Sequence, residues 1–329
     1  MFHRIAIVLL ATFVWTATSG AQEPQQKSQA NADAVASPQP ATKPDTPQQP
    51  QQTPQAKSGG ASSSQPATKP ETPIIPAAAE RHYREGLMQE KEKETQAAVA
   101  EYREAIKEYP DYFEAHYRLG NLLIDEKGYA EAITQLKEAA RLRPNDANVH
   151  NDLGYALKKN GDLIGAIDEF REAIRLNPKL ASAYSNLGNI YFARRDYNSA
   201  IQEYRAALKL QPNNADIRMN LGTALDVSGR VDEAITEYRQ SIKLQPRNAN
   251  AHYNLGIAYK NKKDLTNAIA ELKAATRLAP DWPTPHLVLL QILQNSDPKS
   301  ALDECMIADG LTHDAKLHDQ CLELQKKAQ

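Results

Sequence analysis

Three asparagines recur at a constant interval and offer the first candidate chemistry. Asn186, Asn220 and Asn254 each precede a Leu-Gly pair, and they are 34 residues apart (220 − 186 and 254 − 220). An amide side chain carries both a hydrogen-bond donor and an acceptor. A row of amides can therefore pair with the backbone of an extended peptide, whatever the sequence of that peptide. The spacing indicates recognition by hydrogen bonding.

Histidines are the candidates for acid–base or metal chemistry, but their positions favour a packing role. Five of the eight occupy one slot, four residues before a glycine or its equivalent: His82, His116, His150, His252 and His286. On a helix this slot falls on the packed face, so we interpret these residues as helix-packing side chains. His-Glu-x-x-His, P-loop and Gly-x-Ser-x-Gly motifs are absent from the sequence. We therefore expect no catalytic residue, no metal site and no cofactor.

The composition argues against nucleic acid as a partner. The chain has 329 residues, of which 41% are hydrophobic, so it can bury more than one small core. Its 39 basic and 41 acidic residues nearly cancel. Because no basic excess is present, the sequence does not indicate binding to nucleic acid.

The first residues have the layout of a secretory signal peptide. Arg4 precedes an apolar run at 5–14, and small residues follow it. We expect cleavage after Ala21, with cleavage after Gly20 as the alternative. A transmembrane helix needs about 20 apolar residues, so this run is too short for a stable membrane span. Residues 1–21 therefore predict an exported protein, either periplasmic or secreted.

Residues 22–78 are dominated by Pro, Gln, Ser and Ala and contain few apolar side chains. Such a segment cannot bury enough surface to offset its chain entropy, so we expect a disordered linker. The stretch QPATKPDTP (39–47) is nearly repeated as QPATKPETP (65–73). The favoured role is a spacer, and a short Pro-rich ligand is the alternative.

The only cysteines are Cys305 and Cys321, near the C-terminus. In an exported protein a disulfide between them is a natural expectation. However, Cys321 is expected to lie farther from the turn between its two helices than Cys305 does. The sequence therefore leaves both a disulfide and two free thiols open.

A 34-residue period organises the rest of the chain. Three residue types keep it over six units: prolines at 110, 144, 178, 212, 246 and 280, glycines at 86, 120, 154, 188, 222 and 256, and alanines at 98, 132, 166, 200, 234 and 268. In the last unit, apolar or small residues fall on one face of each of two helices, with a turn at 261–264 between them. Each unit is then a helical hairpin that must stack on its neighbours.

This pattern resembles the tetratricopeptide repeat family. The family's Leu-Gly pair is present at 119–120, 153–154, 187–188, 221–222 and 255–256. Its large residue on the second helix is present as Tyr102, Leu136, Phe170, Tyr204, Tyr238 and Leu272. The resemblance implies an all-α, right-handed superhelical α-solenoid with repeats at 79–112, 113–146, 147–180, 181–214, 215–248 and 249–282.

Both ends of the array depart from the pattern. The first unit has Glu85 where Leu is expected, which suits a terminal cap. Residues 283–329 form a degenerate seventh repeat and a capping helix, with Leu290 in place of the glycine. We expect helices near 284–294, 298–309 and 313–327, the last of them covering the open end.

The resemblance also implies a concave groove lined by the first helix of each unit. The groove residues that it implies are Arg84, Tyr117, Arg118, Asn121, Asn148, Asn186, Asn189, Asn220, Asn250, Tyr253 and Asn254. The asparagines resemble the ladder in the repeat domain of O-linked N-acetylglucosamine transferase. The alternative is that asparagine is simply common in this slot of the family and has no binding role here. We expect these side chains to face solvent in the free protein.

These features predict a non-enzymatic scaffold or adaptor that binds extended protein segments in its groove. The groove lacks the lysines by which some members of the family clamp the tails of chaperones. The alternative function is a structural subunit of an envelope assembly or secretion complex, with contacts through the end caps or the convex face. The partner and the oligomeric state do not follow from the sequence.

Overall fold

The computed structural model describes residues 74–328, and all regular secondary structure in this range is helical. The predicted signal peptide (1–21) and residues 22–73 of the predicted linker lie outside the described residues. The helices are α2 (Ala77–Glu92), α3 (Thr95–Glu108), α4 (Phe113–Asp125), α5 (Tyr129–Leu142), α6 (Ala147–Lys159), α7 (Leu163–Leu176), α8 (Ala181–Ala193), α9 (Tyr197–Leu210), α10 (Ala215–Val227), α11 (Val231–Leu244), α12 (Ala249–Asn261), α13 (Leu265–Leu278), α14 (Pro283–Leu293), α15 (Pro298–Thr312) and α16 (Ala315–Ala328). None of them is long and apolar enough to cross a bilayer.

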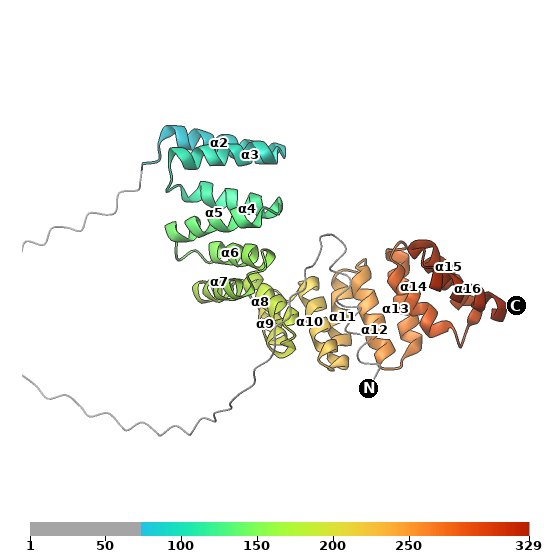
Figure 1. Ribbon diagram of the computed structural model, residues 1–329. Coiled ribbons are helices and arrows are strands. Elements are labelled where there is room, and N and C mark those ends of the chain that lie inside the picture. Colours follow the sequence, from blue (N-terminus) through green and yellow to red (C-terminus); the bar gives the residue numbers. More distant parts are fainter. Residues whose placement is uncertain (1–73, 329) are drawn as a thin grey trace, which may run out of the picture. The chain divides into compact units, whose positions relative to one another are not determined.

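Consecutive helices pair into hairpins, and each hairpin packs on the next one along the chain (Figure 1). The pairs from α2–α3 to α12–α13 confirm the predicted 34-residue units, and α14–α15 forms a seventh. The first helix begins at Ala77, two residues before the predicted boundary at 79. The described chain is therefore an all-α solenoid, as predicted.

Local sequence signals set the ends of many helices. Asp162 precedes α7, and its carboxylate accepts a hydrogen bond from the backbone N–H of Gly165 at 2.9 Å. This bond satisfies one of the donors that the first turn of a helix leaves unpaired. At the other end, α7 stops at Leu176, two residues before Pro178. A proline there cannot continue the helix, so it directs the chain into the next hairpin.

In the six hairpins from α2–α3 to α12–α13, the turn contains one residue with a left-handed backbone. Gly161 and Gly229 have φ values of 92° and 89°. At the equivalent positions in neighbouring units, Lys127, Arg195 and Lys263 have φ values of 62°, 63° and 65°. This conformation costs a non-glycine residue on the order of 1 kcal/mol. Packing of the two helices, more than the turn sequence, therefore holds the hairpin.

Each periodic glycine lies against the large residue of the second helix in its own hairpin. A Cβ atom added to Gly188 would lie 2.8 Å from Cε1 of Tyr204. The same modification at Gly154 would place the atom 2.9 Å from Cε1 of Phe170. Both large side chains are at most 2% exposed. The predicted role of the glycines, close approach of two helices, is confirmed.

Gly188→Leu is expected to destabilise the array by roughly 1–3 kcal/mol, because a side chain there overpacks the core around Tyr204. The measurement is urea denaturation of the variant and the unsubstituted chain. Gly310→Leu is the matched control, because Gly310 is also helical but, apart from the backbone of its own helix and its chain neighbours, nothing lies within 4 Å of its would-be Cβ. Equal midpoints for Gly188→Leu and Gly310→Leu would refute the assigned packing.

The two ends of the array are built differently from the inner units. Glu85 is exposed at the position where the next unit buries Leu119 completely, as the predicted N-terminal cap requires. At the C-terminal end, α16 packs on α15. Cys305 and Cys321 form a disulfide between these two helices, with Cα atoms 5.6 Å apart. The question that the sequence left open is answered in favour of the bonded pair.

In the seventh unit the large residue lies on the first helix and the small residue on the second, the reverse of the arrangement in the inner units. Leu290 replaces the glycine and is only 3% exposed. In this unit the histidine and the glutamate that it contacts, His286 and Glu304, are 18 residues apart in the sequence. In the inner units the corresponding separation is 19 residues. This shortening by one residue places Cys305 at the position of the large residue. The smaller cysteine makes room for the larger leucine.

Candidate peptide-binding groove

The first helices of successive hairpins form one continuous surface. Each of α4, α6, α8 and α10 contacts the first helix of the next unit as well as its own partner. In the described chain, the second helices of successive units have no comparable contact. The stack is therefore locally curved toward the first helices. We call the surface formed by α4, α6, α8, α10 and α12 the inner face.

Three of the predicted amides, Asn186, Asn189 and Asn220, take part in hydrogen bonds between neighbouring units. Lys158 Nζ donates to Asn186 Oδ1 at 3.1 Å, and Asn186 Nδ2 donates to Asn151 Oδ1 at 3.4 Å. Asn220 Nδ2 donates to Asn189 Oδ1 at 3.4 Å. Asn186 and Asn220 are half-buried, so the expectation that they face solvent is wrong. The sequence does not show which slots of adjacent helices meet, so it could not predict these contacts.

Asn254, the third amide of the row, is also half-buried. Asn254 has no hydrogen-bond partner between residues 74 and 328. By contrast, Asn189 accepts two hydrogen bonds, one from Asn220 and one from the Tyr204 hydroxyl at 2.7 Å. The three recurring asparagines are therefore not equivalent. Asn254 has its whole hydrogen-bonding capacity available, and Asn186 and Asn220 have part of theirs.

A polar pocket of about 230 Å³ brings Asn186 and Asn220 together. Its lining comes from α8, from the segment after α9 and from α10: Ser182, Ser185, Asn186, Gln211, Asn214, Asp216, Ile217 and Asn220. Most of these side chains carry a hydrogen-bond donor or acceptor. The pocket therefore combines the amides of two successive units into one site.

The predicted residues of the first units are already paired with other side chains. Arg84 Nε donates to Glu80 at 2.7 Å, and Arg118 lies 3.6 Å from Glu90. The hydroxyl of Tyr117 donates to Asp152 at 2.6 Å. Asn121 is half-buried beside this last pair. This part of the inner face offers fewer open polar groups than the pocket between α8 and α10.

The remaining predicted residues lie apart from the pocket between α8 and α10. Asn148 is exposed and lines a second pocket, of about 540 Å³, formed by the segments before α6 and after α7. Asn250 is exposed on the first turn of α12. Tyr253 packs on Trp282, with ring centroids 4.8 Å apart. The structure therefore does not gather the predicted set into a single site.

Three half-buried charges occupy one slot of the inner face, four residues after the periodic glycine: Lys158, Asp226 and Lys260. Burial, with a smaller contribution from the nearby Lys159, lowers the pKa of Lys158 to about 8. Burial also lowers the pKa of Lys260 and raises the pKa of Asp226. None of the three has an ion-pair partner in the described chain, and Asp226 Oδ1 is buried without a hydrogen bond. An opposite charge on a ligand would stabilise each of them.

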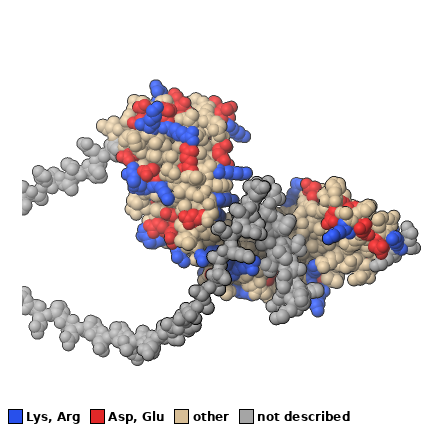
Figure 2. Space-filling view, viewed as in Figure 1, with Lys and Arg blue, Asp and Glu red and all other residues tan. Residues whose placement is uncertain are grey.

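The visible face of the molecule carries both signs of charge. Figure 2 shows lysine and arginine side chains interspersed with aspartate and glutamate, with no large area of a single sign. Opposite charges also pair across units in the described chain, as Arg103 does with Glu131 at 2.8 Å and Arg205 with Glu233 at 2.8 Å. The unpaired charges of the inner face therefore stand out from their surroundings.

The recurring histidines join successive units. Nδ1 of each ring contacts a polar side chain on the second helix. In three of the five, Nε2 also contacts the carbonyl of the proline six residues earlier, whereas His286 Nε2 is buried without a hydrogen bond in the described chain. His116, His150 and His252 make this proline contact, with Nε2–O distances of 2.8, 2.9 and 3.1 Å. In the two units without a histidine, Tyr184 and Arg218 donate to the same proline carbonyl. The histidines pack between helices, as predicted, and they also satisfy a carbonyl group that the sequence pattern did not reveal.

Comparison with known families agrees with the repeat pattern. Models described as TPR repeat match residues 120–161, 156–194, 188–225 and 228–263, and models described as tetratricopeptide repeat match 82–112 and 249–281. Together these matches cover more than half of the chain. No curated protein matches the chain.

Several solved structures share the arrangement of helices. Pseudomonas aeruginosa pilF is 19% identical, with 67% of this chain and 98% of that chain covered and a TM-score of 0.56. The Cut9–Hcn1 hetero-tetramer of the APC/C is 22% identical, with 65% and 42% covered and a TM-score of 0.56. YrrB, described as a TPR protein with an unusual peptide-binding site, is 23% identical, with 59% and 97% covered and a TM-score of 0.49. At these identities the likeness concerns the fold alone. On its repeats, the chain belongs to the tetratricopeptide repeat family.

Proposed function

We propose that this chain is a non-enzymatic scaffold whose inner face binds an extended segment of a partner protein. Membership of the repeat family supports a role in protein–protein interaction. The main observation in support of binding at the inner face is the polar pocket, which is lined by Asn186 and Asn220 from successive units. Each amide nitrogen has two N–H groups, and only one of them is used between residues 74 and 328.

The unpaired charges of the inner face indicate the chemistry of the bound segment. A carboxylate of the segment would pair with Lys158 or Lys260, and a basic side chain would pair with Asp226. Each pairing would relieve a half-buried charge that has no ion-pair partner in the described chain. We therefore propose a segment that carries both acidic and basic residues around a stretch held by its backbone.

We also propose that the protein is exported to the periplasm or the medium. The apolar run at 5–14 and the small residues after it support this, and the disulfide suits an oxidising compartment. Mass spectrometry of the native protein should then find Gln22 as the first residue. A native protein that begins at Met1 would contradict export.

A second candidate function is an assembly subunit that binds through its C-terminal cap. Four large apolar side chains of α15 and α16 are between 37% and 52% exposed: Met306, Ile307, Leu311 and Leu322. Exposed apolar side chains that lie together often mark an interaction site. In this case the partner would bind the end of the array and leave the inner face open.

Site-specific photocrosslinking in the native compartment distinguishes the two functions. The crosslinker replaces Asp216, which is exposed and lines the polar pocket, or Ile307 on the cap, or Gln202 on the second helix α9 as a control. The proposed function predicts a discrete adduct from position 216 and none from position 202. An adduct from position 307 alone would favour the assembly subunit and contradict binding at the inner face.

A further inference from the structure

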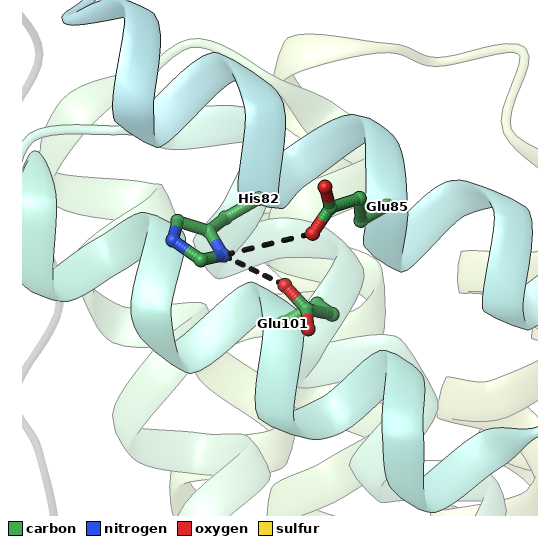
Figure 3. Close-up of side chains that lie close together, drawn as sticks. All are labelled: His82, Glu85 and Glu101. Atoms are coloured by element: carbon green, nitrogen blue, oxygen red, sulfur yellow. Dashed lines mark hydrogen bonds and ion pairs between the residues drawn. The ribbon is translucent and has the colours of Figure 1, made fainter.

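The first hairpin holds a cluster of potential metal ligands that the inner units lack. His82 Nδ1 lies 2.7 Å from Glu101 Oε2 and 4.0 Å from Glu85 Oε2. Figure 3 shows His82 and Glu85 on one helix pointing toward Glu101 on the neighbouring helix. The three ligand atoms lie within 4.8 Å of one another. Within the described residues, this is the one group of His, Cys, Asp and Glu side chains with such spacing.

Two departures from the repeat pattern create this cluster. Glu85 occupies the slot where the next unit buries Leu119, and its side chain is 47% exposed. In addition, Nε2 of His82 contacts Arg81 at 3.2 Å, whereas the inner histidines contact a proline carbonyl. The His–Glu pair itself is ordinary for this protein, because His150 and Glu169 form it too, at 2.6 Å. What is specific to the first unit is the additional carboxylate.

From this geometry we infer that His82, Glu85 and Glu101 form a binding site for Zn²⁺ or a similar divalent transition metal ion. One imidazole and two carboxylates are a ligand set that zinc accepts, with water in the fourth position. Tetrahedral zinc with bonds of about 2.1 Å needs donor atoms about 3.4 Å apart. The observed separations of 2.7 and 4.0 Å lie on either side of this value. The exposed Glu85 side chain is free to make the small movement that closes the site.

Arg81 opposes metal binding at this site. Its guanidinium lies 3.2 Å from His82 Nε2 and 4.0 Å from Glu85 Oε1, so it competes for both groups. When a metal ion binds Nδ1, the single proton of the neutral imidazole must be on Nε2. Nε2 can then no longer accept a hydrogen bond from Arg81. The competition is weak, since the Arg81 side chain is 64% exposed. Arg81 therefore lowers the affinity without blocking the site.

Titration calorimetry of the full chain with ZnCl₂ tests the site. The test variant is Glu85→Gln, and the matched control is Glu169→Gln, which removes the carboxylate of the equivalent pair in an inner unit. Glu85 is exposed, so this variant should retain the fold, and circular dichroism checks that it does. We expect zinc binding at micromolar concentration that Glu85→Gln weakens at least about tenfold and Glu169→Gln leaves unchanged.

A second variant changes the affinity in the opposite direction. Arg81→Met removes the competing cation but no ligand, so it should tighten zinc binding several-fold. Mg²⁺ in excess should not compete, because it prefers a shell of oxygen ligands. Zinc binding that is equally tight in the unsubstituted chain and in Glu85→Gln, or no saturable zinc binding at micromolar concentration, would overturn the assignment.

Discussion

Replacement of both Cys305 and Cys321 by serine is expected to destabilise the C-terminal helix by about 3 kcal/mol, the value for a crosslink that closes a loop of about 15 residues. The two cysteines are 16 residues apart, and the bond joins α15 to α16. Helix α16 buries few side chains, chiefly Leu317, Cys321 and Leu324. A terminal helix with so little buried surface depends strongly on its covalent link.

Hydrogen exchange followed by mass spectrometry measures this effect locally. Amides of α16 should lose protection in the double variant, while those of α8 to α11 keep it, since each unit contacts only its neighbours. Reduction of the unsubstituted protein is the control, because it breaks the bond without burying two hydroxyl groups. Unchanged protection of α16 in both samples would contradict a stabilising role for the disulfide.

The triple variant Asn186→Ala, Asn220→Ala, Asn254→Ala is expected to bind the partner segment more than about tenfold more weakly. Each amide hydrogen bond contributes about 0.5–1.5 kcal/mol net, and about 1.4 kcal/mol corresponds to tenfold in affinity. Asn254 alone should account for a full share, because it forms no hydrogen bond within the described chain. Asn186 and Asn220 should contribute less per residue, because they must share their capacity with Lys158 and Asn189.

The same variant should also lower the stability of the free protein slightly. The bond from Lys158 to Asn186 and the bond from Asn220 to Asn189 are lost, and both join neighbouring units. The control is Gln202→Ala, an exposed change on the second helix α9. Affinity should depend only weakly on salt, because the inner face carries Lys158 and Lys260 as well as Asp226.

The repeat pattern was sufficient to predict the helices and their pairing. Glycine and a large residue sixteen positions later, such as Gly188 and Tyr204, specify two helices in close contact, and the proline after each hairpin fixes the period. These signals are local or recur at a fixed distance, so they can be read without coordinates. The left-handed turn residue could not be predicted in this way, because Lys127 and Arg195 adopt it as well as glycine.

The candidate site was less predictable, because it depends on contacts between units. The period identifies the slot of Asn186 but not the neighbour that it meets, which is Lys158 on the preceding first helix. Asp226 and Lys260 have no ion-pair partner in the described chain, and only the folded structure reveals that no opposite charge lies close to them. The disulfide was left open for the same reason, because its geometry depends on the shortened seventh unit.

The affinity of the triple asparagine variant for the partner segment tests the central claim most directly. The segment is the one recovered by crosslinking from position 216, and titration calorimetry measures its Kd with the unsubstituted chain, the triple variant and Gln202→Ala. The account predicts a Kd that rises more than about tenfold in the triple variant and stays unchanged in the control. Equal affinity of all three proteins, with the fold of the triple variant intact, would contradict binding of the segment by the inner-face amides.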